Sequence, residues 1–195
     1  MEFTPSSFNH LVKNRRSVFP KQFDTSRKVP DQIIEQVLEN ACWAPNHGQA
    51  EPWFFTVFAR EGLQTFAALQ SSLYEEASGE DFKESKCQQL KEKPLLASHI
   101  ISIGMRRTTT KAIPEMEDIA AVACAVQNMY LSVTAYGLGG YWTTGGVTYF
   151  ESAKQHFGLA SGDKLLGFFY IGYIGIPSPV AKRSPITEKS VWVTV

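Results

Sequence analysis

The sequence predicts a single α+β domain, and three observations lead to this class. Runs rich in aromatic and β-branched residues, typical of buried strands, lie between amphipathic or alanine-rich runs that are typical of helices. No internal repeat and no linker rich in Gly, Ser or Pro divides the chain. Its 195 residues, 44% of them hydrophobic, suit one domain with a sizeable core.

Helices are expected where apolar residues recur with a helical period. The clearest begins at Pro30-Asp31, because the apolar residues that follow lie on one face, and Pro45 ends it. The longest, Glu115–Tyr136, is apolar nearly all round and rich in alanine, so it should be buried on most sides. Shorter helices are expected at Ser6–Asn14, Glu61–Leu73 and Ser152–Phe157.

Strands are expected in the aromatic and β-branched runs. They cover Trp53–Ala59, Ala97–Met105, Tyr141–Val147, Leu165–Ile174 and Val191–Val195. Between the first two, the charges from Tyr74 to Lys93 alternate in sign, which indicates a solvated helix or a mobile excursion.

Composition excludes several classes of function. Nineteen basic and 19 acidic residues cancel, whereas nucleic-acid binding needs a basic surplus. Of the two most apolar segments, Ile119–Leu138 contains polar residues such as Gln127, and Leu165–Ile176 is shorter than the roughly 20 residues of a spanning helix, so no membrane partner is expected. The N-terminal segment does not resemble a secretory signal, and three scattered cysteines indicate a reducing cytoplasm. Charged residues are only 19% of the chain, which raises the question of which surface does not face water.

Familiar catalytic motifs are missing from the sequence. It contains no phosphate-binding G-x-x-x-x-G-K-[ST], no H-E-x-x-H and no G-x-S-x-G, and the four histidines lack metal-ligand spacing. His99 lies inside an apolar strand and is expected to be a hydrogen-bonded core residue. We therefore expect no catalytic side chain and no metal, but a bound cofactor that carries the chemistry.

Three segments are candidates for binding that cofactor. Arg15-Arg16-Ser17 could grip a phosphate monoester, or its cations could simply complement the negative end of the preceding helix. The polar loop Ala44–Trp53 enters a buried strand and needs partners, although a turn with a packing tryptophan would explain it too. The glycines of Gly139–Gly146 would let backbone N–H groups approach a flat or anionic ligand, or they form a flexible connection.

Taken in order, these segments resemble the nitroreductase family of flavoproteins. The likeness consists of R-R-S near the start, a helix ending in A-P-N-H with P-W and an aromatic strand, the long buried helix with G-L-G-G, and G-F-F-Y-I-G. It covers roughly Phe8 to Arg183. It implies a three-layer α/β/α sandwich with a mainly antiparallel sheet. It also implies bound FMN and a homodimer with FMN at the subunit interface, and Val191–Val195 is a candidate strand for the partner's sheet.

The resemblance also assigns roles to residues. Arg15, Arg16 and Ser17 would hold the phosphate, ribityl chain and pyrimidine edge, and Arg183, or Lys182 in its place, would add a phosphate contact. Asn46 and His47 would reach the partner subunit's flavin. The residues expected along the isoalloxazine ring, with backbone N–H groups near N5 and O4, are Trp142, Thr143, Thr144 and Gly145.

The implied activity is hydride transfer from NADH or NADPH, through flavin N5, to a small electron-poor acceptor such as a nitroaromatic or a quinone, in a ping-pong cycle. Two alternatives stay open: an FMN enzyme of the same fold that performs dehydrogenation or reductive dehalogenation, and a flavin-binding protein without turnover. The chain departs from its relatives at Glu51, where many have glutamine, and at Thr143-Thr144, so the substrate face is not assigned.

Overall fold

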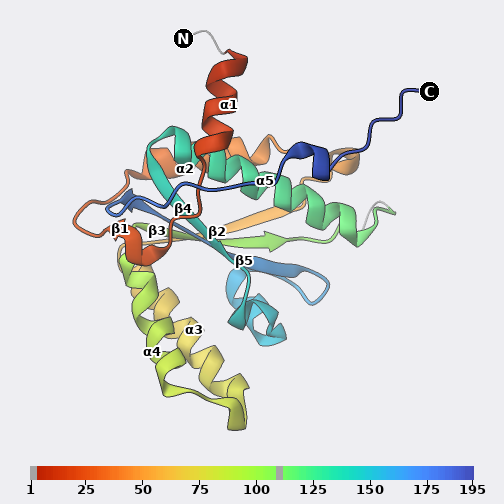
Figure 1. The fold of residues 1–195 in the computed structure, drawn as a ribbon. Helices are drawn as coiled ribbons and strands as arrows, with labels where there is room; N and C mark the ends of the chain where they lie inside the picture. Colours follow the sequence, from red (N-terminus) through yellow and green to blue (C-terminus); the bar gives the residue numbers. More distant parts are fainter. Residues whose placement is uncertain (1–3, 109–111) are drawn as a thin grey trace.

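A mainly antiparallel sheet forms the middle layer of the computed structural model, which describes residues 4–108 and 112–195 (Figure 1). Its long central strand, β5 (Lys164–Ile174), pairs antiparallel with three others: β1 (Phe23–Asp24), β3 (His99–Met105) and β4 (Leu138–Thr143). β2 (Trp53–Ala59) pairs with β3 and forms one edge of the sheet. The predicted sheet is confirmed.

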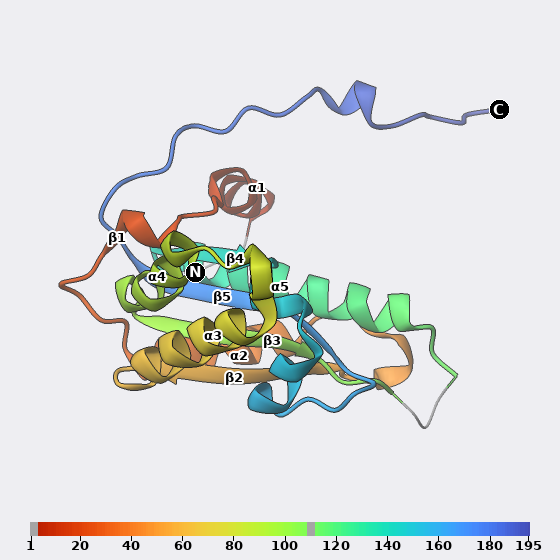
Figure 2. The same cartoon turned by 90° about the horizontal axis from the view of Figure 1, so that it is seen from below.

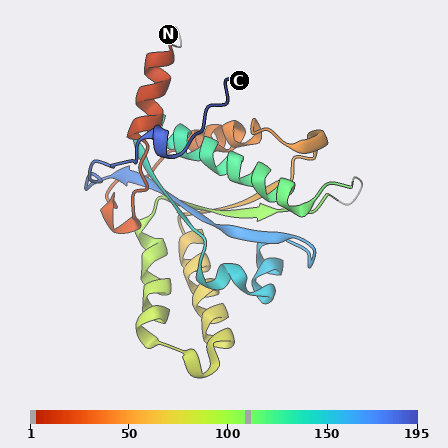
Figure 3. The ribbon, with the colours of Figure 1, turned by 45° about the vertical axis from the view of Figure 1, so that its right-hand side comes forward.

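Helices cover both faces of this sheet (Figures 1 and 3). On one side lie α1 (Pro5–Asn14), α2 (Asp31–Cys42) and α5 (Glu115–Ala135), and on the other lie α3 (Gly62–Ser78) and α4 (Glu84–Glu92). The α/β/α sandwich is therefore confirmed. Short 3₁₀ helices connect these elements: η1 (Pro20–Gln22), η2 (His47–Gln49), η3 (Gly79–Asp81), η4 (Lys93–Leu96), η5 (Gly146–Tyr149), η6 (Glu151–Phe157) and η7 (Ile186–Glu188).

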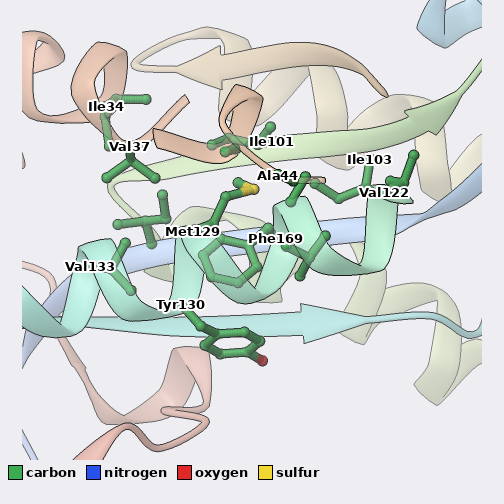
Figure 4. Packing of buried hydrophobic residues seen from close by; sticks show 14 of the residues in the cluster. Ile34, Val37, Ala44, Ile101, Ile103, Val122, Met129, Tyr130, Val133 and Phe169 are labelled. Carbon is green, nitrogen blue, oxygen red and sulfur yellow. The ribbon is translucent and has the colours of Figure 1, made fainter. Parts of the chain in front are cut away.

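Two hydrophobic clusters fix the layers. In the first, Val37 of α2 and Met129 of α5 pack on Phe169 of β5, all fully buried (Figure 4). In the second, on the α3 side, Phe66 meets Phe168 with ring centroids 4.8 Å apart in an edge-to-face arrangement. Because a cluster lies on each face, β5 and β3 are buried on both sides, as their continuous apolar runs predict.

Helix α5 is only partly buried within one chain. Ala121, Val122, Ala125 and Met129 face the sheet, but Met116 is 72% exposed. The outward face also exposes a set of mostly small residues: Ala120, Ala123, Cys124 and Gln127. Burial on most sides, expected from the sequence, is thus wrong for the isolated chain.

Strand β4 begins earlier than predicted, at Leu138 instead of Tyr141, and ends at Thr143. Gly139 and Gly140 belong to this strand, where close packing requires glycine. A Cβ at Gly140 would lie 2.6 Å from Cζ of Phe169, a distance that real side chains do not show. The residues expected to complete the strand, up to Val147, instead turn into η5.

The segment from Tyr74 to Lys93 contains the end of α3 and the whole of α4, and these two helices form a hairpin that projects from the sheet (Figure 3). Cys87 fixes α4 against α3, since its buried thiol donates a hydrogen bond to a Glu75 carboxylate oxygen at 2.8 Å. Lys91 contacts the same oxygen at 3.2 Å. The excursion is therefore built of two packed helices.

After β5 the chain leaves the domain as an extended tail (Figure 2). Val191–Val195, predicted as a strand, pairs with no strand among residues 4–108 and 112–195, and Trp192 is 86% exposed. That prediction is wrong for the single chain, because no described neighbour offers its side chains an apolar surface. Among the described residues, no helix has the length and apolarity needed to cross a membrane.

His99 is a hydrogen-bonded core residue, as predicted. Its Nε2 lies 3.1 Å from Asp31 Oδ1 and its Nδ1 lies 3.1 Å from Ser98 Oγ, and the residue is 4% exposed. Burial lowers the pKa of His99, and the cations Arg60 and Lys28 act in the same direction, whereas Asp31 opposes them.

Acidification should therefore destabilise the fold through this histidine. The pKa of His99 in the folded protein lies below its unfolded value of about 6.5, so protons bind the unfolded chain more readily. The stabilisation is complete above about pH 6.5 and is lost as the pH falls toward the folded pKa. We expect urea unfolding at pH 7.5 and 5.5 to show a smaller difference in unfolding free energy for His99→Gln than for the wild type. Equal differences would contradict this assignment.

Candidate functional site

A cavity of about 500 Å³ gathers cations from both ends of the chain. Lys13, Arg15 and Arg16 follow one another at the end of α1, and Arg183 joins them from the tail. None of the residues that line the cavity is acidic, and the complete set is Val12, Lys13, Arg15, Arg16, Gln127, Ala181 and Arg183. Two predicted arginines and the distant Arg183 thus share one site, and Lys182 is outside its lining.

Arg16 also supports the alternative interpretation of this segment. Its Nη1 donates hydrogen bonds to the carbonyl oxygens of Lys13, at 2.6 Å, and Arg15, at 2.8 Å. The guanidinium therefore caps the end of α1 while its charge stays at the cavity. Capping and anion binding are compatible here.

Tyr130 of α5 connects the first predicted segment with the third. The Arg15 guanidinium lies over its ring, 5.0 Å from the centroid, and its hydroxyl lies 3.2 Å from Ser17 Oγ. The same hydroxyl accepts the backbone N–H of Trp142 at 2.8 Å. Beside it, the Val18 N–H donates to the Gly140 carbonyl at 2.9 Å. Sequence reasoning missed Tyr130, whose only signal is a phenol on an otherwise aliphatic helix face.

The end of β4 borders a second cavity of about 140 Å³. Thr143 and Gly145 line it together with Lys86 and Lys93, and none of its lining residues is acidic. Thr144 is exposed and outside that lining. The Trp142 indole N–H donates to the Leu166 carbonyl at 3.1 Å, so this side chain holds the sheet together.

Lys93 is a second residue that sequence reasoning missed. Its Nζ lies 4.8 Å from the ring centroid of Tyr141 and 5.3 Å from that of Tyr170. Burial lowers the pKa of Lys93, and the charge of Lys86 adds to the effect. A half-buried cation that packs on two aromatic rings beside Thr143 is placed to meet a negative charge. In the sequence, Lys93 lies at the end of the segment whose charges alternate in sign, a pattern that predicts a solvated side chain.

The loop after α2 is held by local hydrogen bonds, and none of its residues lines the cation cavity. Asn46 Oδ1 accepts the Glu51 N–H at 3.0 Å, and Asn46 Nδ2 donates to the Ala44 carbonyl at 3.3 Å. His47 pairs with Glu117, the third residue of α5, and its side chain is 58% exposed. Glu51 has φ 45°, a conformation that costs a non-glycine residue energy and is enriched at functional sites.

Asn46 and His47 are therefore not brought together with Arg15–Ser17 in one chain. His47 contacts α5 at residue 117, whereas Ser17 contacts it at Tyr130. Thirteen residues of helix separate the two contacts by about 20 Å. Within the described residues, no group of three or more His, Cys, Asp or Glu side chains could hold a metal ion.

The model of the nitroreductase family matches residues 12–173, most of the chain. The chain belongs to the nitroreductase family. This membership makes it an enzyme of the oxidoreductase class and confirms the resemblance. Arg183 lies beyond the segment that matches the family, so the cation cavity also uses the tail.

Relatives and solved structures agree with this nitroreductase assignment. The Escherichia coli K12 protein named "Putative NAD(P)H nitroreductase YdjA" is 30% identical over 141 residues, covering 71% of this chain and 74% of the relative. A nitroreductase-like family protein of Bacillus cereus superposes with a TM-score of 0.82 at 28% identity, covering 99% of both chains. A Desulfovibrio desulfuricans structure described as a putative nitroreductase in complex with FMN shares the fold, with a TM-score of 0.71 at 19% identity over 100% of this chain and 99% of that one.

Proposed function

We propose that this nitroreductase-family enzyme binds FMN as a homodimer and passes hydride from NADH or NADPH to an electron-poor acceptor such as a nitroaromatic or a quinone. Bound FMN would supply the two-electron chemistry, accepting hydride at N5 and releasing it to the acceptor. The FMN in the Desulfovibrio desulfuricans neighbour and the name of the Escherichia coli relative support this proposal.

The acid-free cation cavity is the observation that carries the proposal. A phosphate monoester has roughly two negative charges near neutral pH, and it prefers the planar donor fork of arginine. Arg15, Arg16 and Arg183 present three such forks to one space, and Lys13 adds a fourth positive charge. The residues present therefore fit the phosphate of FMN, which they would hold by charge-assisted hydrogen bonds.

The strand beside this cavity fits the rest of the cofactor. Ser17 and Trp142 both hydrogen-bond to the Tyr130 hydroxyl, and Gly145, three residues beyond Trp142, has open space where a side chain would be. Lys93 would stabilise negative charge that develops on a ring bound there. Since the flavin is the reagent, the enzyme needs no nucleophile or proton relay of its own, in line with the motifs absent from the sequence.

Three exposed features support a homodimer. The outward face of α5 is lined with small residues, the tail presents an extended apolar segment, and no described strand pairs with the outer edge of β2. Asn46 and His47, about 20 Å along α5 from Tyr130, would then face the partner's flavin. The low content of charged residues, 19% of the chain, would then be explained by a large area of surface that contacts the partner subunit. We expect the enzyme in the cytoplasm, since Cys42, Cys87 and Cys124 are all unpaired.

The visible spectrum of the purified protein tests the proposed function. We expect flavin absorption bands and, in stopped-flow, bleaching by NADH or NADPH followed by reoxidation with a quinone or nitroaromatic. A colourless protein that FMN does not reconstitute would refute the proposal. Bound FMN that no nicotinamide bleaches would favour a flavin-binding protein without turnover. Bleaching without turnover of any nitro or quinone acceptor would favour dehydrogenation or dehalogenation chemistry.

A further inference from the structure

The hydroxyl of Tyr130 has a single arrangement of hydrogen bonds that satisfies it. It already accepts the Trp142 backbone N–H at 2.8 Å, and the residue is 8% exposed. A buried phenol proton needs an acceptor of its own. In the described part of the chain, Ser17 Oγ at 3.2 Å is the other hydrogen-bond partner of this oxygen.

The direction of the second hydrogen bond follows from this count. If Ser17 donated to Tyr130, the tyrosine oxygen would accept twice and its own proton would have no acceptor. Tyr130 therefore donates and Ser17 accepts, which leaves the Ser17 proton free. The Arg15 guanidinium over the tyrosine ring draws electron density from it and makes the phenol a better donor.

The hydroxyl proton of Ser17 is available to donate a hydrogen bond to a bound ligand. Ser17 is exposed, it lies beside Gly140 at the start of β4, and it is outside the lining of the cation cavity. Ser17 therefore lies beside β4, outside the set of residues that line the cation cavity. A ligand atom that meets it there must be a hydrogen-bond acceptor, such as a carbonyl oxygen or a ring nitrogen.

We propose that Tyr130 is a positioning residue that sets the polarity of the Ser17 hydroxyl, so that Ser17 donates a hydrogen bond to an acceptor atom on the ring or ribityl part of the flavin. This inference rests on the proposed function, since it takes FMN as the ligand. It adds that Tyr130 acts through Ser17 and that the pair does not recognise the phosphate.

A double-mutant cycle on the whole protein tests the proposal. Dissociation constants of FMN and riboflavin are measured by flavin fluorescence for the wild type, Ser17→Ala, Tyr130→Phe and the double variant. Phenylalanine keeps the ring beneath Arg15 and removes only the hydroxyl. Loss of one hydrogen bond should weaken binding by about three- to tenfold in each single variant. The double variant should be no weaker than the singles, because each breaks the same chain of hydrogen bonds.

Three comparisons distinguish a specific positioning role of Tyr130 from a general loss of order in the binding site. Tyr136→Phe, on the exposed phenol at the end of α5, should bind both flavins as the wild type does. The ratio of FMN to riboflavin affinity should stay unchanged in Tyr130→Phe, whereas a loosened helix would disturb Arg15 and lower that ratio. Ser17→Thr, which keeps the hydroxyl, should restore the affinity lost in Ser17→Ala.

Additive losses, an unaffected Tyr130→Phe or a lowered FMN to riboflavin ratio would overturn the inference. If Tyr130→Phe does not fold, the serine pair decides: a loss in Ser17→Ala that threonine restores supports the inference, and no loss contradicts it. A wild-type protein that binds neither flavin would refute the proposed function itself, so the two failures are distinct.

Discussion

Arg183→Ala should weaken FMN binding by about 10- to 150-fold. A hydrogen bond to a charged group contributes about 1.5–3 kcal/mol, and each 1.4 kcal/mol changes an equilibrium tenfold. Arg183 is exposed, and its guanidinium donates a hydrogen bond to the carbonyl of the adjacent Lys182 at 2.8 Å, so its removal should leave the fold intact. Titration of apoprotein with FMN, followed by flavin fluorescence, gives the dissociation constant.

Riboflavin and a substitution of Lys189, in the same tail, provide the controls. Riboflavin lacks the phosphate, so Arg183→Ala should leave its dissociation constant unchanged. Lys189→Ala removes the same charge from the same tail, but outside the cation cavity, and should bind FMN normally. The assignment of a phosphate site would be contradicted if Arg183→Ala weakened the binding of FMN and riboflavin equally, or if Lys189→Ala weakened FMN binding as much as Arg183→Ala does. Raising the salt concentration should also weaken FMN binding more in the wild type than in Arg183→Ala.

Replacing Val191, Trp192 and Val193 together with serine should convert the proposed homodimer to monomer at micromolar concentration. In the single chain these side chains are 84–92% exposed. Burial of a large apolar side chain against a partner contributes about 1.5–3 kcal/mol. Losing three of them should therefore raise the dimer dissociation constant by several orders of magnitude. Sedimentation equilibrium measures the change directly.

Thr194→Ser is the matched control, since it alters the same segment without removing a large apolar side chain. It should sediment as the wild type does. The serine-substituted monomer should also retain FMN poorly, because Asn46 and His47 of the partner subunit would be missing from each site. A wild-type protein that is a stable monomer would refute both the dimer and the shared site.

The sequence predicts those elements whose local pattern agrees with their final environment. Helix α2 has one apolar stripe and a proline after its end, so its bounds follow from periodicity alone. Strands β3 and β5 are buried on both faces, and their continuous apolar runs predict this. In β4, Gly140 is needed for close contact with Phe169, which is distant in sequence. No local pattern contains that contact.

The residues of the candidate site likewise divide into those that the local sequence predicts and those whose role depends on the fold. Arg15 and Arg16 are adjacent in the sequence and are candidates for an anion site, but on their own they could simply complement the negative end of the preceding helix. Arg183 was expected from the family resemblance, and it reaches them only through the path of the tail. Tyr130 is 113 residues from Ser17, so its role depends on how α5 packs beside β4. The sequence pattern around Lys93 predicts an exposed side chain. In the structure Lys93 is half-buried, because it packs on the rings of Tyr141 and Tyr170.

The extended tail also bears on how long the protein survives. Beyond Ser178, no hydrogen bond or ion pair found in the described residues ties the tail to the body of the domain, and the tail carries Lys182, Arg183 and Lys189. Exposed, extended chain is what proteases cleave, and those that cut after basic residues have three sites here. Docking on a partner would hide this segment. The monomer is therefore the vulnerable species, and the lifetime of the enzyme should rise with its own concentration.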